Sequence, residues 1–171
     1  GTPPTGTTND ILTAAGDKRA LFYAKDRTLE ISNTDAIKDF KKGYSVVKFT
    51  GIKSDGSPVT DTGHADTDFF FRVAEAYLAY AEATARLNGG TATTQGITYL
   101  NELRKRSGAT ELRGFSLREI LNERSREFYF EGQRRTDLIR YGYFGGDNNY
   151  MWSWKGGAPN GRTFDVRRNI F

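Results

Sequence analysis

The sequence has 171 residues, of which 37% are hydrophobic, with a net charge of +4 and no cysteine. This length suits one domain, because a chain of this size can bury a sizeable core. Its basic residues are scattered among acidic ones, which argues against a nucleic-acid-binding protein. The lack of cysteine excludes disulfides and thiolate metal sites. No apolar run reaches the roughly 18 residues that a membrane-spanning helix needs.

Residues 1–65 are rich in Gly, Thr and Asp and show no helical periodicity. Apolar and β-branched runs at 19–31 and 44–50 predict brief strands or extended segments that lie on a larger body. His64 is the only histidine, so we expect a solvated loop residue and no transition-metal site. The acidic residues of this segment are spaced too irregularly for an EF-hand, and calcium held by scattered loop oxygens stays an open alternative.

Two helices are predicted next, in the helical core over residues 66–142. The first runs over 69–88, with the acidic residues before it as N-cap candidates, and ends at Asn-Gly-Gly. Its many alanines favour helix formation and allow close approach of a neighbouring helix. The second runs over 94–107 and stops at Gly108. Together they predict an αα-hairpin reminiscent of a tetratricopeptide unit.

A capping box opens a third predicted helix. Ser116 and Glu119 have the S-x-x-E spacing in which each side chain caps the other residue's backbone N–H. An apolar run follows directly, so we expect the helix to continue to about residue 131 and to stop at Gly132. A short helical piece is predicted over 137–141.

Residues 121–142, LNERSREFYFEGQRRTDLIRYG, interleave charged with apolar side chains. We expect the charges to pair with one another at a packed helix junction, as a structural motif of Arg124, Glu127, Glu131, Arg135, Asp137 and Arg140. The alternative is an acid/base pair of Glu127 and Glu131 on one helix face. A glycosidase pair, however, flanks its substrate across a cleft, and nearby arginines lower carboxylate pKa values. We therefore favour the structural interpretation.

The closing segment, residues 143–171, is a predicted loop rich in Gly, Asn and aromatic residues. Sugar binding uses flat rings flanked by amides and charged groups, and the candidates for ligand contact are Asn148, Tyr150, Trp152, Trp154 and Lys155. The three aromatic residues alternate, so an extended backbone would place them on one side. The alternative is that these rings anchor the loop on the helices.

Several long segments agree, in chain order, with one family. They are GDKRALFYAKDRTLEI, GYSVVKFTG, DFFFRVAEAYLAYAEATARLNGG, LNELRKRSG, NERSREFYFEGQRRTDLIRYGYF, YMWSWKGG and RRNIF. These segments resemble the C-terminal part of the SusD/RagB family, the nutrient-binding lipoproteins of Bacteroidetes. YMWSWKGG further resembles the branch close to the starch-binding founder. Because this segment lies near the closing end of the family fold, the anchoring alternative for the aromatic loop is favoured.

The resemblance implies a mainly α fold, with tetratricopeptide-like helix pairs, long irregular loops and a few short strands. It implies that residues 1–65 pack on the helical core 66–142, that 143–171 close the fold, and that the chain is the C-terminal part of a larger domain. It further implies a non-enzymatic, surface-exposed lipoprotein of the outer membrane. Such a protein binds a glycan, here a starch-like α-glucan, beside a SusC-like TonB-dependent transporter. From the residues themselves we expect no cofactor and no transition-metal site.

Two alternatives remain from other functional classes. One is a helical protein-interaction scaffold whose glycan site lies in an N-terminal part. The other is a glycoside hydrolase with carboxylates across a groove. The chain begins at Gly1 without a signal peptide or a lipidation cysteine, so we expect a processed or truncated product whose membrane contact depends on a lipid anchor that this chain lacks.

Overall fold

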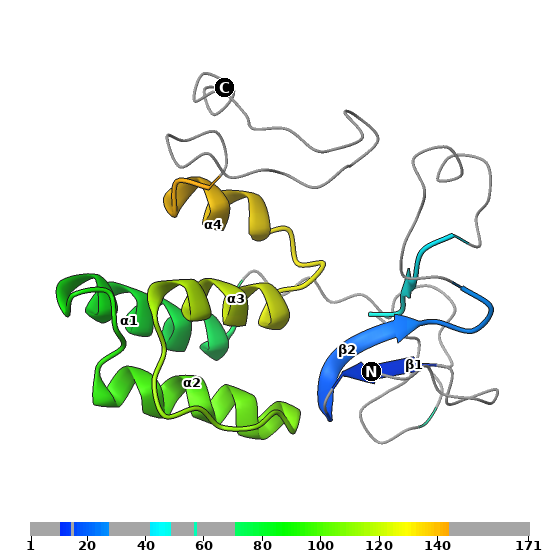
Figure 1. The fold of residues 1–171 in the computed structure, drawn as a ribbon, viewed down its shortest axis with the longest axis horizontal. Helices are drawn as coiled ribbons and strands as arrows, with labels where there is room; N and C mark the ends of the chain where they lie inside the picture. The colour runs from blue at the N-terminus through cyan, green and yellow to red at the C-terminus, as the bar shows by residue number, and fades with distance from the viewer. Residues whose placement is uncertain (1–10, 15, 28–41, 49–56, 58–70, 144–171) are drawn as a thin grey trace. The chain divides into compact units, whose positions relative to one another are not determined.

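The computed structural model describes residues 11–14, 16–27, 42–48, 57 and 71–143. This part of the chain is mainly helical with a few short strands, which confirms the predicted fold class. Its elements, drawn in Figure 1, are β1 (Ile11–Ala14), β2 (Asp17–Tyr23), β3 (Ser45–Val46), α1 (Val73–Leu87), α2 (Thr94–Ser107), α3 (Leu117–Glu127) and α4 (Arg134–Arg140).

The chain divides into two compact units. The first comprises Gly1–Lys25 and Ser45–Glu123, and the second comprises Asp26–Tyr44 and Arg124–Phe171. The first unit holds the three strands, α1, α2 and most of α3, whereas the second holds the end of α3 and all of α4. The predicted division at residues 65 and 142 stays a prediction.

The strands form an antiparallel sheet in the order β1-β2-β3. Ile11 lies opposite Tyr23, and Phe22 lies opposite Val46, with a register shift between Leu12 and Ala14. The extended segment predicted at 19–31 overlaps β2, which begins two residues earlier, and the segment at 44–50 contains β3, whereas β1 was not predicted. A strand of four residues carries too little alternation to stand out in a sequence.

The αα-hairpin of α1 and α2 confirms the predicted helix pair. Gly90 donates its N–H to the Ala85 carbonyl at 2.8 Å, and Gly89 and Gly90 have φ values of 65° and 88°. This left-handed ending satisfies carbonyls of the last turn of α1. The two helices approach closely at Gly96. A Cβ added to this residue would lie 3.4 Å from the Ala81 Cα.

α2 has the predicted bounds, and Gly108 ends it with a φ of 78°. The predicted capping box of α3 is also confirmed. The Ser116 N–H donates to Glu119 Oε2 at 2.6 Å, and the Glu119 N–H donates to Ser116 Oγ at 3.3 Å. The segment before α3 is tied to the hairpin turn, since Ala92 donates its N–H to the Phe115 carbonyl at 2.8 Å.

The predicted start of the first helix was wrong. α1 begins at Val73 rather than 69, because Arg72 at its N-cap has extended backbone (φ −130°, ψ 151°) and no side-chain cap. The N-cap position of α1 is thus Arg72, and the predicted N-cap candidates at 66–68 lie outside the described residues.

The predicted junction after the third helix was also wrong. α3 ends at Glu127 rather than 131, and α4 occupies Arg134–Arg140 rather than 137–141. Phe130 has a left-handed φ of 63°, a conformation that a helix of L-residues cannot contain. Glu127 and Glu131 consequently do not share a helix face, because a turn separates them.

Candidate functional site

The junction of α3 and α4 is held by a buried ion pair. Arg124 of α3 donates from Nε to Asp137 Oδ1 of α4 at 2.9 Å, and from Nη2 to Gln133 Oε1 at 3.0 Å. Arg140, one turn further along α4, donates to the same Asp137 oxygen at 2.8 Å. The Arg124 and Asp137 side chains are 6% and 2% exposed. Two guanidinium groups thus neutralise one buried carboxylate.

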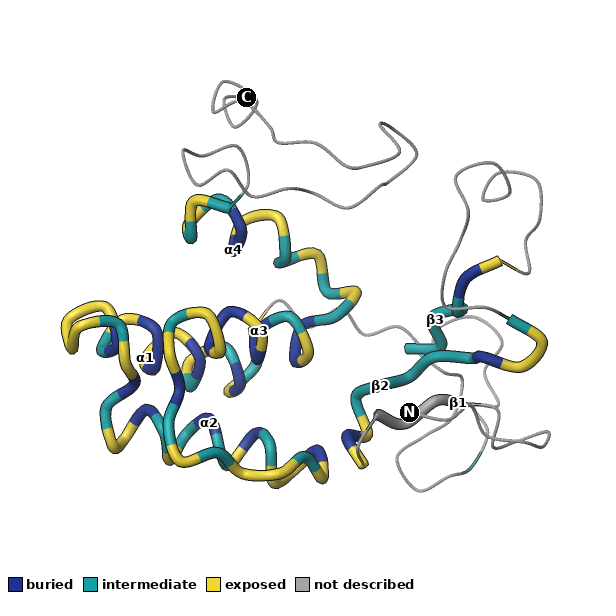
Figure 2. Tube along the Cα trace, in the orientation of Figure 1, coloured by how far each residue is buried: buried dark blue, intermediate teal, exposed yellow. Residues whose placement is uncertain are grey.

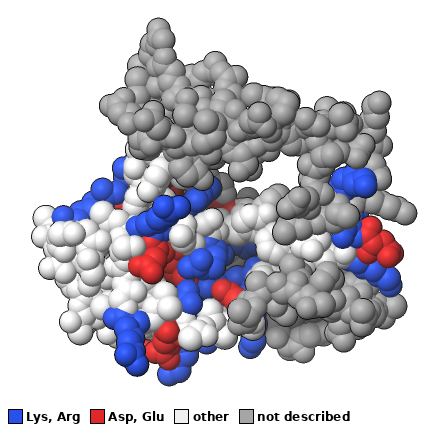
Figure 3. Space-filling model, in the orientation of Figure 1, with Lys and Arg blue, Asp and Glu red and all other residues white. Residues whose placement is uncertain are grey.

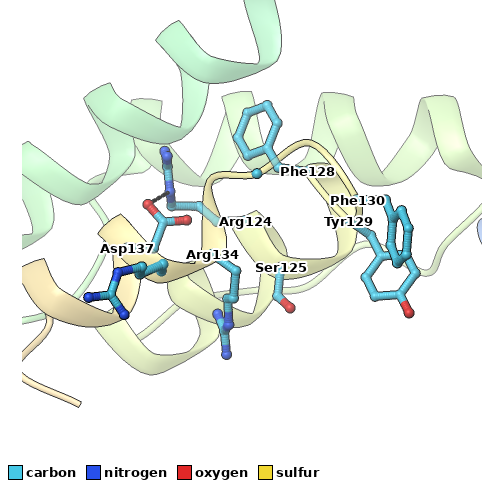
Figure 4. A pocket seen from close by; sticks show the side chains of 9 residues that line it. Arg124, Ser125, Phe128, Tyr129, Phe130, Arg134 and Asp137 are labelled. Carbon is cyan, nitrogen blue, oxygen red and sulfur yellow. Dashed lines mark hydrogen bonds and ion pairs between the residues drawn. The ribbon is translucent and has the colours of Figure 1, made fainter. Parts of the chain in front are cut away.

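A pocket of about 320 Å³ lies beside this ion pair. Its lining combines the aromatic turn after α3 with the start of α4, as Figure 4 shows. The lining residues are Arg124, Ser125, Phe128, Tyr129, Phe130, Gly132, Arg134, Arg135 and Asp137. The Arg124 guanidinium carbon lies 5.2 Å from the centre of the Phe128 ring, a cation–π distance.

The aromatic turn presents two neighbouring rings at the pocket. The ring centres of Tyr129 and Phe130 are 5.3 Å apart at an interplanar angle of 53°. Burial raises the pKa of the Tyr129 phenol, so this hydroxyl stays a neutral donor and acceptor at physiological pH. The left-handed backbone of Phe130 turns its side chain outward, where it is largely exposed.

The pocket lining combines one carboxylate with basic, aromatic and hydroxyl side chains. Asp137 is the one carboxylate in its lining, and two arginines hold it. Aromatic faces, guanidinium groups and a hydroxyl can contact a polar ligand with apolar faces, but this lining contains no acid/base pair.

A second buried ion cluster lies in the first unit. Glu123 of α3 has a fully buried side chain whose two oxygens lie 2.7 Å from Arg19 Nη1 of β2 and 2.7 Å from Arg104 Nη1 of α2. Arg19 also pairs with Asp17 at 2.7 Å. Burial works to lower the pKa of Arg19, but hydrogen bonds and charges of Asp17 and Glu123 outweigh it, and the pKa is raised. The cluster links the sheet, α2 and α3.

The structure brings some of the predicted site residues together. Arg124, Asp137 and Arg140 form one ion-paired group, and Arg135 lines the adjoining pocket. Glu127 is buried, and Glu131 is partly exposed in the turn after α3. The five loop candidates lie outside the described residues, and their role in ligand contact stays a prediction. They are Asn148, Tyr150, Trp152, Trp154 and Lys155.

The Glu123 cluster was not predicted from the sequence. A signal existed, because Glu123 falls three residues after Ile120, on the buried stripe of α3. A carboxylate on such a stripe requires a buried cation. Its partners Arg19 and Arg104 are 104 and 19 positions away in the chain, and no local pattern connects them to it.

Charges of both signs are mixed on the one face of the described residues that Figure 3 draws. On the face drawn in Figure 3, basic and acidic side chains of the described residues lie beside one another rather than in a field of one sign. Among the helices described, none is both long and apolar enough to cross a membrane. In the same residues, no group of three acidic or imidazole side chains is placed to hold a metal ion.

Comparison with known proteins decides the family. Residues 22–169 match the model of the SusD family, a range that includes all four helices and the pocket. The chain belongs to the SusD family. This confirms the resemblance inferred from the long sequence segments.

Two SusD-family relatives are similar over most of this chain. The starch-binding protein SusD of Bacteroides thetaiotaomicron is 47% identical over 162 residues, which cover 91% of this chain and 28% of that protein. The SusD-like protein P25 of Formosa agariphila is 38% identical over 138 residues, which cover 75% of this chain and 25% of that protein. The chain thus spans about a quarter of the length of these relatives.

Proposed function

We propose that this chain is part of a non-catalytic protein that binds an oligosaccharide at the cell surface for import. The observation that carries the proposal is the 47% identity, over 91% of the chain, to a protein named for starch binding. A starch-like α-glucan is therefore the proposed ligand. The proposed setting is the outer membrane, with a lipid anchor and a SusC-like TonB-dependent transporter as partner.

The chemistry of the described residues supports binding rather than hydrolysis. The Asp137 carboxylate of the charged motif forms ion pairs with Arg124 and Arg140. Glu127 and Glu131 are separated by a turn. Hydrolysis of a glycosidic bond needs two carboxyl groups on opposite sides of the substrate. We propose that the motif maintains the α3–α4 junction while loops outside the motif contact the glycan, with the aromatic loop at 148–155 as a candidate.

The test is calorimetric titration of the protein with maltoheptaose, xylohexaose and a host-type sialylated oligosaccharide. We expect binding of maltoheptaose and no release of shorter sugars in chromatography of the mixture. Trp152→Ala and Trp154→Ala should weaken binding, because a stacked ring contributes on the order of 1–3 kcal/mol. Phe71→Ala, which removes an aromatic residue that is 86% exposed outside the loop, is the matched control. Release of shorter sugars would contradict the non-catalytic proposal.

A second candidate is a helical scaffold that contributes no sugar contacts. The observation that favours it is that the chain spans only about a quarter of its relatives, so the glycan site can lie elsewhere in a longer polypeptide. In that case the titration shows no binding by this chain, although the starch-binding relative binds maltoheptaose under the same conditions.

A further inference from the structure

The pocket beside the α3–α4 junction has more hydrogen-bond donors than acceptors among its side chains. Three arginines line it, whereas Asp137 is its one carboxylate, and a guanidinium donates hydrogen bonds but accepts none. Asp137 is already held by two guanidinium groups, and the remaining side-chain acceptors of the lining are the hydroxyls of Ser125 and Tyr129. A ligand that matches this lining is therefore rich in acceptors and negatively charged.

Arg124 is a nearly buried donor of this pocket, with a side chain that is 6% exposed. A guanidinium has N–H donors on each of its nitrogens. Nε of Arg124 donates to Asp137 and Nη2 donates to Gln133, but the residues that the structure describes supply no hydrogen-bond acceptor for its Nη1. A carboxylate is the acceptor that pairs best with a guanidinium, because charge-assisted hydrogen bonds are stronger than neutral ones. The pocket thus has a donor group suited to an organic anion.

The aromatic turn after α3 indicates the shape of the ligand. The rings of Phe128, Tyr129 and Phe130 line the pocket, and residues 129–133 are exposed or half-buried, as Figure 2 shows between α3 and α4. Aromatic side chains pack well against other flat rings. The hydroxyl groups of a sugar need acceptors as well as donors, and this lining has few acceptors. A flat aromatic ring that carries a carboxylate therefore matches the lining better than a sugar does.

Phe130 has a strained backbone at this pocket. Its φ is 63° and its side chain is 62% exposed. Left-handed backbone is unfavourable for a residue with a bulky side chain, and a ring that stays largely exposed gains little from packing within the chain. Strained residues of this kind cluster at ligand sites. The exposed ring on a strained turn is an observation independent of the arginines, and it also indicates a ligand.

We propose that this pocket binds a small aromatic carboxylate. The carboxylate meets the Arg124 guanidinium, Arg134 and Arg135 add positive charge around it, and the ring lies against Tyr129 and Phe130. The pocket volume of about 320 Å³ is at the lower end of the range of about 300–1,000 Å³ for small-molecule sites, which suits one ring with a short acidic substituent. This site is separate from the proposed glycan contacts, which lie outside the motif, and it does not depend on them.

The test is a titration of the protein with phenylacetate, with its neutral amide phenylacetamide and with glucuronate, followed by NMR. For phenylacetate we expect a Kd on the order of 1 mM and a shift of the Arg124 Nε–H signal. Phenylacetamide has nearly the same shape without the charge and should bind roughly tenfold more weakly. Equal affinities for the acid and the amide, or no binding of either, would overturn the proposal. Tighter binding of glucuronate than of phenylacetate would overturn the aromatic assignment and indicate an acidic sugar.

Phe130→Gly distinguishes a ligand contact from a packing role. Glycine adopts left-handed backbone without strain, so the melting temperature should stay the same or rise, while the affinity for phenylacetate falls roughly fivefold to tenfold. Phe71→Ala, at an exposed aromatic residue outside the pocket, is the control and should leave the affinity unchanged. Unchanged affinity in Phe130→Gly, or a loss of affinity that comes with a lower melting temperature, would overturn the proposal.

Arg135→Gln tests the contribution of charge. Arg135 is exposed at the pocket, so its replacement should weaken the binding of phenylacetate severalfold and leave that of phenylacetamide unchanged. Arg113→Gln, at an exposed arginine before α3, is the matched control and should affect neither ligand. An equal loss of affinity for the acid and the amide in Arg135→Gln would contradict recognition of the carboxylate.

Discussion

Arg124 and Asp137 are 13 residues apart in the chain, on different helices, yet they share a buried hydrogen bond of 2.9 Å between Nε and Oδ1. The turn between them contains the left-handed Phe130. This turn reverses the chain so that α4 can place Asp137 beside α3. The ion pair and the adjoining pocket therefore depend on the same backbone geometry.

Arg124→Ala should destabilise the protein by roughly 3 kcal/mol, because removing one partner leaves a buried charge with less compensation. Breaking a buried ion pair typically costs about 3–5 kcal/mol. Arg140 still reaches Asp137 at 2.8 Å, so we expect a loss at the low end of this range. Urea unfolding measures it. Arg118→Ala, on the exposed side of α3, is the control and should change stability by less than about 0.5 kcal/mol. A folded Arg124→Ala protein with unchanged stability but without maltoheptaose binding would show that Arg124 serves ligand binding rather than the stability of the α3–α4 junction.

Glu123→Gln should cost roughly 2 kcal/mol in the free energy of unfolding, because a neutral amide cannot replace a carboxylate between two guanidinium groups. The shape of the side chain is retained, so the loss reports charge. Glu102→Gln on the exposed face of α2 is the control, since exposed charges contribute little. Equal unfolding midpoints for the two variants would show that the Arg19–Glu123–Arg104 cluster adds no stability.

Ser116→Ala should destabilise α3 by about 1 kcal/mol at neutral pH through loss of the cap. Hydrogen bonds from the Ser116 backbone and hydroxyl lower the pKa of Glu119 below its ordinary value of 4.5. A lowered folded-state pKa adds stability above the unfolded value, and that stability is lost as the pH falls through the folded value. The difference between wild type and Ser116→Ala should therefore shrink below pH 4.5, as thermal unfolding across that range can show. A difference that grows in acid would contradict the assignment.

Gly108→Ala should destabilise the first unit more than Gly89→Ala. Both glycines have left-handed backbone, with φ values of 78° and 65°, so each substitution carries a strain of about 1–2 kcal/mol. A Cβ at Gly108 would also lie 2.9 Å from the Gly16 carbonyl oxygen, whereas one at Gly89 would meet nothing within 4 Å. The excess loss for Gly108→Ala, read from denaturant midpoints, measures that close approach. Equal losses would mean that the β1–β2 turn can shift away at little cost.

Local chemistry determined the parts of this fold that the sequence predicted well. The bounds of α2, the Asn-Gly-Gly end of α1 and the capping box of α3 depend on groups within a few residues of one another. Such hydrogen bonds and backbone preferences are already present in a short stretch of sequence. The family followed from the order of several long segments, and the match over residues 22–169 confirms it.

Tertiary structure alone decided the end of α3, the start of α4 and the partners of the buried charges. Residues 128–131 continue a helical pattern in sequence, but Phe130 adopts left-handed backbone, and α4 begins only at Arg134. Glu123 meets Arg19 and Arg104 only after β2, α2 and α3 have come together. Burial and the distance between remote side chains are properties of the packed chain, so the residue order near each position does not contain them.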